Sequence, residues 1–416
     1  MSNTLFDYLD NCVTQFHTTA VCEKHLQENG YRKLETGEVW ELQPNGRYYT
    51  IPYGSMLLAF SIGEKVEKLR IGIAHTDFPC LKLKSNPDMI RAGYHMANVE
   101  PYGGLIMETW FDRPLGLAGK VVLKGENPFE PKVQLYQSEK PLFVVPSLAP
   151  HLKRDDKPGK VEPQKELIPL YDLEKRGNII DVVASDMKLD ASHILDYDLY
   201  LYNMDKASYV GIGEQMISAP RIDDISSVAA LMEMSGTEPA ADSMNVITLF
   251  DNEEIGSRSK QGADSVMMGS IIDRILKSLG MSDAKKADIY QHTFMMSLDV
   301  AHGVHPNYTE KADPTNPVNL GGGVVLKSSA SQRYVTDSEA SAVIMALAEK
   351  FDIKVQRQVN KSGMAGGQTL GPIISSYIPV MAVDMGIPVL AMHSARELGA
   401  VEDYRQLCKL IRAVFS

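Results

Sequence analysis

The feature that most constrains the fold is an alternation of apolar strand patterns with amphipathic helix patterns. Strand patterns occupy residues 68–74, 246–250 and 294–298, and helix patterns occupy residues 225–232 and 338–350. A chain that alternates in this way forms a sheet with helices packed on both of its faces. The sequence therefore predicts an α/β fold for the parts of the chain in which this alternation runs.

A β-rich middle section, residues 88–215, interrupts the alternation with strand patterns such as residues 120–123 and 133–136. We interpret it as an inserted domain, which leaves residues 1–87 and 216–416 as one catalytic domain. At the N-terminus, apolar residues at helical spacing predict a single helix over residues 5–29. Residues 380–383 and 389–392 are predicted as the last strands.

Composition excludes several functional classes. The 416 residues contain 42 Lys and Arg against 53 Asp and Glu, a net charge of −11, so attraction to nucleic acid or to an anionic membrane is not expected. The four cysteines form no C-x-x-C pair. The N-terminus lacks the layout of a signal peptide, and no apolar run is long enough to span a membrane. We therefore expect a cytoplasmic protein.

Histidines and carboxylates follow the predicted strands, and ligands bind open α/β sheets outside the carboxyl ends of their strands. Nitrogen and oxygen ligands without cysteine suit a catalytic zinc site. The set is larger than one zinc requires, and two metals sharing a bridging carboxylate would use all of it. The residues are His75 and Asp77; Asp251, Glu253 and Glu254; Asp299; His393; and Asp223, which precedes the helix pattern.

Taken singly, each of these residues has an ordinary structural explanation, such as a helix cap or a solvated pair. The joint pattern favours a metal site, because separate strand and helix junctions all carry metal-type ligands. Other catalytic signatures are absent: the sequence contains no G-x-x-x-x-G-K-[ST], no G-x-S-x-G and no H-E-x-x-H.

At these residues the sequence resembles the aspartyl aminopeptidase family of two-zinc exopeptidases. The similarity extends along nearly the whole chain. Its segments occur in the family's order: AHTDFPCLKLK, YGGLIMETWFDRPLGLAGKV, PSLAPHLKRD, APRIDDISS, FDNEEIGSRSKQGADS, SLDVAHGVHPNY, SQRYVTDS and VLAMHSARE. The resemblance implies a mixed sheet flanked by helices, with an inserted β-rich dimerisation domain.

The resemblance also implies a role for each site residue. Asp223 would bridge two divalent ions, with His75 and Asp299 completing one metal site and Glu254 and His393 the other. Glu253 would be the general base, and Asp77 would orient His75. His302 and Lys327 match substrate-contacting positions, and His151 matches a histidine that reaches a neighbouring subunit's active site. A cis peptide bond between Asp223 and Asp224 is also implied, as are dimers that assemble into a tetrahedral dodecamer with an inner chamber.

The function implied is hydrolysis of the first residue, with Asp or Glu preferred, from short peptides. Zinc is the expected metal, and manganese or cobalt would also suit a carboxylate-rich site. Phe78 stands where the family usually has serine, so an aminopeptidase for neutral residues is an alternative. The same ligands would also serve a two-zinc carboxypeptidase or deacylase. A non-catalytic peptide-binding assembly is a third alternative, disfavoured because binding alone needs no base at Glu253.

Overall fold

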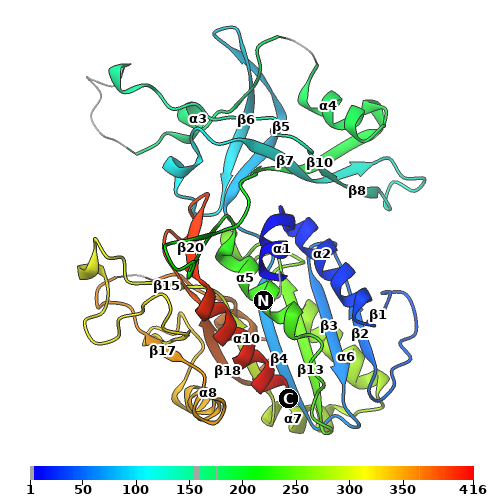
Figure 1. Cartoon of the computed structure of the whole chain (residues 1–416). Helices are drawn as coiled ribbons and strands as arrows, with labels where there is room; N and C mark the ends of the chain where they lie inside the picture. Colours follow the sequence, from blue (N-terminus) through cyan, green and yellow to red (C-terminus); the bar gives the residue numbers. More distant parts are fainter. Residues whose placement is uncertain (1–3, 153–159, 175–176, 365) are drawn as a thin grey trace.

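The computed structural model describes residues 4–152, 160–174, 177–364 and 366–416. A large sheet covered by helices forms one part of the molecule, and a second, antiparallel sheet stands above the edge of the first (Figure 1). In the part of the chain that is described, no helix is long and apolar enough to cross a membrane.

The large sheet has nine strands in the order β1-β2-β3-β13-β4-β14-β18-β16-β17. It is a mixed sheet, because β13, β4, β14 and β18 run parallel to one another whereas β3 and β16 join them in antiparallel pairs. This confirms the predicted fold class. The strands are β1 (Arg32–Lys33), β2 (Arg47–Thr50), β3 (Leu57–Ile62), β4 (Lys68–His75), β13 (Ser243–Phe250), β14 (Phe294–Leu298), β16 (Val324–Lys327), β17 (Val355–Gln358) and β18 (Met381–Gly386).

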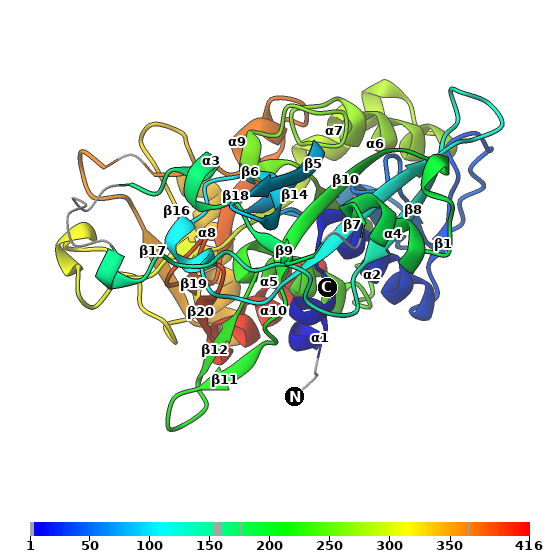
Figure 2. The ribbon, with the colours of Figure 1, turned by 90° about the horizontal axis from the view of Figure 1, so that it is seen from above.

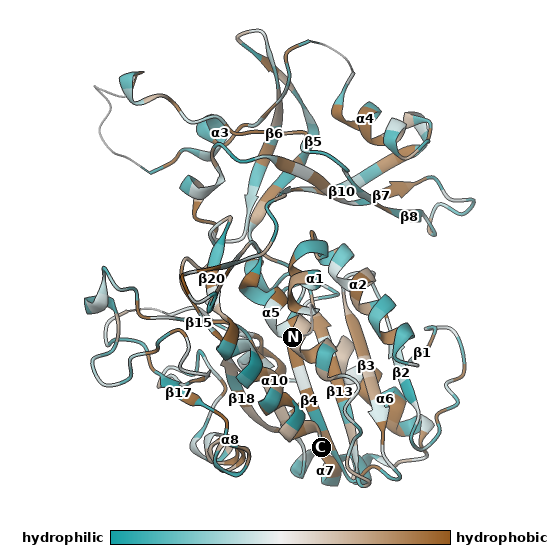
Figure 3. Cartoon of the chain, in the orientation of Figure 1, coloured by the Kyte–Doolittle hydropathy of each residue, from teal (hydrophilic) through white to brown (hydrophobic). Residues whose placement is uncertain are grey.

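Helices cover both faces of this sheet, and an apolar core lies on each side. One core packs beneath α1 (Thr4–Asn11), α2 (Gln15–Glu28), α5 (Ile222–Met234), α8 (Ser338–Phe351) and α10 (Val401–Phe415). The other packs beneath α6 (Met267–Ser278), α7 (Asp283–Gln291) and α9 (Leu370–Ser375). Strands β3, β4 and β13 are largely apolar, while the helices alternate apolar and polar stripes (Figure 3). This is the pattern expected of a buried sheet between amphipathic layers.

The second sheet is entirely antiparallel and has the order β8-β7-β10-β5-β6-β9. It has its own apolar core, to which α4 (Ile179–Asp186) contributes Ile179 and Val183. The division of the chain at residues 88 and 215 remains a proposal. The strands are β5 (Cys80–Arg91), β6 (Tyr94–Tyr102), β7 (Leu115–Leu123), β8 (Lys132–Gln137), β9 (Leu170–Asp172) and β10 (Ile194–Asn203).

Two small sheets lie beside the large one. In the first, β11 (Ser208–Val210) and β12 (Met216–Ala219) form a hairpin that extends from the side of the molecule (Figure 2), and β20 (Glu397–Ala400) pairs with β12. In the second, β15 (Ala301–His302) runs parallel to β19 (Pro388–Val389).

The prediction of one helix over residues 5–29 is wrong. The structure has two helices, α1 and α2, separated at residues 12–14. Thr14 caps the second helix by accepting a hydrogen bond from the backbone N–H of His17. Val13, between the helices, is buried against Ala118 and Tyr202 of the second sheet. A capping residue and tertiary packing therefore override the helical periodicity.

The predicted last strand, residues 389–392, is also mostly absent, because β19 ends at Val389. Beyond it the backbone turns, with φ of 54° at Ala391 and 67° at His393. His393 donates its backbone N–H to the carboxylate of Glu397 at 2.7 Å, which holds this turn in place. His393 thus reaches the site from a turn rather than from the end of a strand.

Candidate metal centre and catalytic cleft

Three parallel strands bring the predicted ligands together. Strands β13, β4 and β14 are adjacent in the sheet, with β4 in the middle, so their carboxyl ends lie side by side. His75 ends β4, Asp299 follows β14, and a short 3-10 turn from Glu253 to Ile255 follows β13. Asp223 enters from the first turn of α5, where the Asp223–Asp224 peptide bond is cis.

The carboxylate of Asp223 lies between two imidazoles. Its Oδ1 lies 3.4 Å from Nε2 of His75, and its Oδ2 lies 3.4 Å from Nε2 of His393. The first imidazole is also 3.9 Å from Oδ1 of Asp299, and the second is 3.5 Å from Oε2 of Glu254. Each oxygen of Asp223 therefore belongs to a different set of three metal-type ligands.

These residues fit a pair of divalent cations. Both sets combine one imidazole nitrogen with carboxylate oxygens, which is the donor chemistry of catalytic zinc. Burial, together with the charge of Asp223, raises the pKa of Glu254 well above its usual range. Burial raises the pKa of Glu253 to about 8, and neighbouring carboxylates such as Asp299 add to the effect. So many buried carboxylates need compensating positive charge, which bound cations supply.

Asp77 belongs to neither ligand set, but it contacts residues of both. Its backbone carbonyl lies 3.0 Å from Nδ1 of His75, and its carboxylate Oδ1 lies 3.5 Å from the same nitrogen. The carboxylate also accepts hydrogen bonds from the backbone N–H groups of Glu253 at 3.1 Å and Glu254 at 3.2 Å. Asp77 thus fixes both an imidazole and the turn that carries the two glutamates, as groups behind metal ligands commonly do.

Two further residues hold the site in place, and the sequence analysis does not predict them. Glu397 accepts the backbone N–H of Asp223 at 3.0 Å as well as that of His393, so one buried side chain positions both. Tyr102 donates its hydroxyl to Asp77 Oδ2 at 2.8 Å. Both residues lie inside segments of the family resemblance, but neither has a spacing that indicates this contact.

The ligands open into a cleft with a cavity volume of about 460 Å³. Its walls include both ligand sets and Glu253, together with His302, Lys327 and Tyr334. Lys327 is only 2% exposed, and it donates hydrogen bonds to Asp299 Oδ2 at 3.2 Å and to the carbonyl of Val300 at 3.0 Å. Lys327 therefore holds Asp299, a candidate metal ligand, and also lines the cleft.

Three residues singled out in the sequence lie elsewhere. Asp251 is buried beside the turn and belongs to neither ligand set. Phe78 is buried with its ring centroid 5.6 Å from the guanidinium of Arg221, and it is not among the residues that line the cleft. His151 lies in an exposed 3-10 turn, Pro150–Leu152, beside the second sheet, and it does not line the cleft either.

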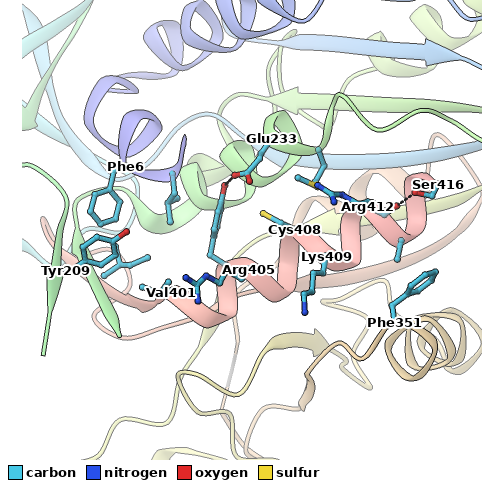
Figure 4. Close-up of a pocket in the computed structure, with 15 residues that line it drawn as sticks. Phe6, Tyr209, Glu233, Phe351, Val401, Arg405, Cys408, Lys409, Arg412 and Ser416 are labelled. Carbon is cyan, nitrogen blue, oxygen red and sulfur yellow. Dashed lines mark hydrogen bonds between the residues drawn. The ribbon is translucent and has the colours of Figure 1, made fainter. Parts of the chain in front are cut away.

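A pocket larger than this cleft lies elsewhere in the molecule. A pocket of about 550 Å³ lies along α10, bordered by Phe6, Tyr209 and Phe351 (Figure 4). Its acidic residue, Glu233, accepts a hydrogen bond from the hydroxyl of Tyr404 at 2.9 Å. Among the described residues, no member of either ligand set lines this pocket, and neither does Glu253.

Two sets of imidazole and carboxylate ligands that share Asp223, gathered beside the carboxyl ends of β13, β4 and β14, are the site of a metal-dependent hydrolase. Residues 8–415 match the model of the M18 family, described as aminopeptidase I zinc metalloprotease. The chain belongs to this family and is a metal-dependent aminopeptidase. It is 38% identical to the probable M18 family aminopeptidase 2 of Clostridium novyi, over all of this chain and 98% of that protein.

Solved structures agree with this assignment. One chain of the cryo-EM structure of the Ape4 and Nbr1 complex is 29% identical, with a TM-score of 0.92 over 99% of this chain and 84% of that one. The mApe1 dodecamer of S. cerevisiae is 26% identical, with a TM-score of 0.84 over 99% of this chain and 95% of that one.

Proposed function

We propose that the protein hydrolyses the N-terminal residue of short peptides, with Asp or Glu preferred, using two divalent metal ions and Glu253 as the general base. The observation that carries the proposal is the placement of Asp223 between His75 and His393, with one carboxylate oxygen toward each. Zinc is the first choice because the donors are imidazole and carboxylate, and manganese or cobalt would fit the same set.

The residues of the cleft supply the remaining chemistry. Bound cations would lower the pKa of water and polarise the scissile carbonyl. Glu253 accepts the proton of the attacking water and returns it to the leaving amine, and its backbone is held for this task by Asp77. The carboxylates of the cleft would receive the positively charged α-amino group of the peptide, which restricts cleavage to the first residue.

The acidic preference rests on Lys327. Among the described residues that line the cleft it is the only lysine or arginine, and two of its three N–H groups are used by Asp299 and Val300. The third would meet the side-chain carboxylate of an N-terminal Asp or Glu. Phe78, whose identity raised the neutral alternative, does not line the cleft and so does not shape this pocket directly.

Substitution of Lys327 by Met is expected to erase the acidic preference. A charge-assisted hydrogen bond is worth ~1.5–3 kcal/mol, or about 10- to 150-fold in selectivity. The measurement is the ratio of kcat/KM for aspartyl and leucyl aminoacyl substrates, because a general loss caused by disturbing Asp299 cancels in the ratio. A wild-type enzyme that cleaves leucyl substrates faster would refute the acidic preference and leave the aminopeptidase assignment intact.

We also propose that residues 88–215 form a dimerisation domain that delivers His151 to a partner's active site, within a tetrahedral dodecamer of dimers. Two exposed leucines flank this histidine, Leu148 at 48% and Leu152 at 70% exposure, as expected at a surface that a partner covers. The mApe1 structure of S. cerevisiae, which is a dodecamer, supports the assembly. All four cysteines are free and buried, which supports the proposed cytoplasmic location.

Mixed dimers test the role of His151. Chains carrying His151→Ala and chains carrying Glu253→Gln are each expected to have low activity. After subunit exchange, activity should recover in part, because a hybrid dimer contains one site with both groups. Exchange demonstrated by labelled chains without any recovery would show that His151 does not act across the interface.

A further inference from the structure

A second cavity of about 530 Å³ lies next to the catalytic cleft. It is bordered by the loop that follows β15 and by the end of β17, and its walls include His305, Lys311, Val318, Gln358 and Lys361. Its volume is within the range of small-molecule and peptide pockets.

The cavity and the cleft share a wall. His302, at the end of β15, lines both of them. Lys327 of the cleft and Gln358 of the second cavity are register partners on the parallel strands β16 and β17. A peptide whose first residue lies beside Lys327 therefore has an adjoining space available for the residues that follow.

Gln358 lines this cavity and carries a hydrogen-bonding atom that is not used within the described structure. The residue is only 6% exposed, yet its Oε1 is buried with no hydrogen-bond partner among the described residues. A buried polar atom left unpaired costs free energy, so such atoms are normally paired in the functional state. A backbone N–H of a bound peptide would supply the missing donor.

The charged groups of the cavity are predominantly basic. Lys311 and Lys361 line it, and Asp313 is the only acidic residue among the lining residues. The Oδ1 of Asp313 is already engaged by its own loop, since it accepts hydrogen bonds from the backbone N–H groups of Thr315 and Asn316, each at 3.0 Å. Nζ of Lys361 donates a hydrogen bond to the backbone carbonyl of Glu310 at 2.6 Å, which uses one of its three N–H groups and leaves its charge. Asp313 keeps its negative charge, so the lining carries two ammonium groups against one carboxylate and favours an anionic ligand.

We propose that this cavity binds the downstream part of the peptide substrate, with Gln358 accepting a backbone N–H and Lys311 and Lys361 attracting the C-terminal carboxylate. The inference rests on the proposed aminopeptidase function and names its substrate class more closely: short peptides with a free C-terminus. It also gives a reason for short substrates, because the carboxylate reaches the lysines only when few residues follow the scissile bond.

Three substrates with the same N-terminal residue test the proposal: an aminoacyl p-nitroanilide, peptides of three to five residues with a free carboxylate, and their C-terminal amides. In the double variant Lys311→Gln/Lys361→Gln, kcat/KM for the best free-acid peptide is expected to fall about tenfold. Values for its amide and for the nitroanilide should change less than about twofold, because neither presents a carboxylate to the lysines. The matched control is Lys24→Gln/Lys65→Gln, which removes two exposed charges elsewhere.

The variant Gln358→Leu tests the other contact. Both the free-acid peptide and its amide should lose about fivefold in kcat/KM, whereas the nitroanilide, which lacks a downstream peptide N–H, should not. Its melting temperature should not fall, since Oε1 has no partner to lose. Equal losses on all three substrates, or no loss on the free-acid peptide in the lysine variant, would overturn the proposal. Failure of the proposed function itself is distinguishable, because the wild-type protein would then cleave none of the three.

Discussion

Glu253→Gln is expected to lower kcat by about 10²–10⁴-fold while the metal content stays unchanged. The substitution keeps the size of the side chain and the backbone N–H that donates to Asp77, and it removes only the group that accepts the proton. Steady-state kinetics together with metal analysis of the purified variant provide the measurement.

Glu254→Gln is the matched control, because the neighbouring glutamate belongs to the ligand set of His393 and Asp223. This variant should lose metal affinity first, and added metal should restore part of its activity. Near-normal turnover by Glu253→Gln, or metal loss equal to that of Glu254→Gln, would show that Glu253 is not the base.

Asp223→Asn is expected to weaken the binding of both ions, by more than the ~10–100-fold typical for residues that only support ligands. The physical reason is geometric, since each oxygen of this carboxylate faces a different imidazole, and an amide presents one oxygen and one N–H in their place. Titration with zinc followed by calorimetry measures both affinities.

Asp251→Asn is the control for this substitution. Asp251 is equally buried at the end of β13, and burial raises its pKa to about 7, but it belongs to neither ligand set. It should retain both ions. Loss of a single ion in Asp223→Asn would contradict the bridging position and assign Asp223 to one site only.

Much of this site could be predicted because its ligands follow strands that the sequence marks clearly. The apolar runs before His75, Asp251 and Asp299 correspond to β4, β13 and β14, and parallel neighbours necessarily align their ends. The sequence predicts His393 directly after a strand, whereas the structure has a turn before it. A short apolar run does not reveal that the backbone adopts a positive φ. The contacts of Glu397 and Tyr102 were not predictable, since they depend on loops folded against distant segments.

For Lys327, too, the sequence predicts only part of what the structure shows. The family resemblance implies a substrate-contacting position for Lys327, and the residue lines the cleft. Its hydrogen bond to Asp299 depends on β16 and β14 lying on either side of β18. Sequence spacing carries no information about such neighbours. The same applies to the register that brings Gln358 beside Lys327.

We expect two bound metal ions and a free peptide N-terminus both to be required for cleavage. The most direct measurement follows hydrolysis of one acidic peptide, with a free or an N-acetylated N-terminus, by metal-depleted enzyme as zinc is added back. We predict that cleavage of the free peptide rises as two equivalents of zinc bind per chain, while the acetylated peptide remains intact throughout. Full activity in the metal-depleted enzyme, or equal cleavage of the acetylated peptide, would contradict the claim.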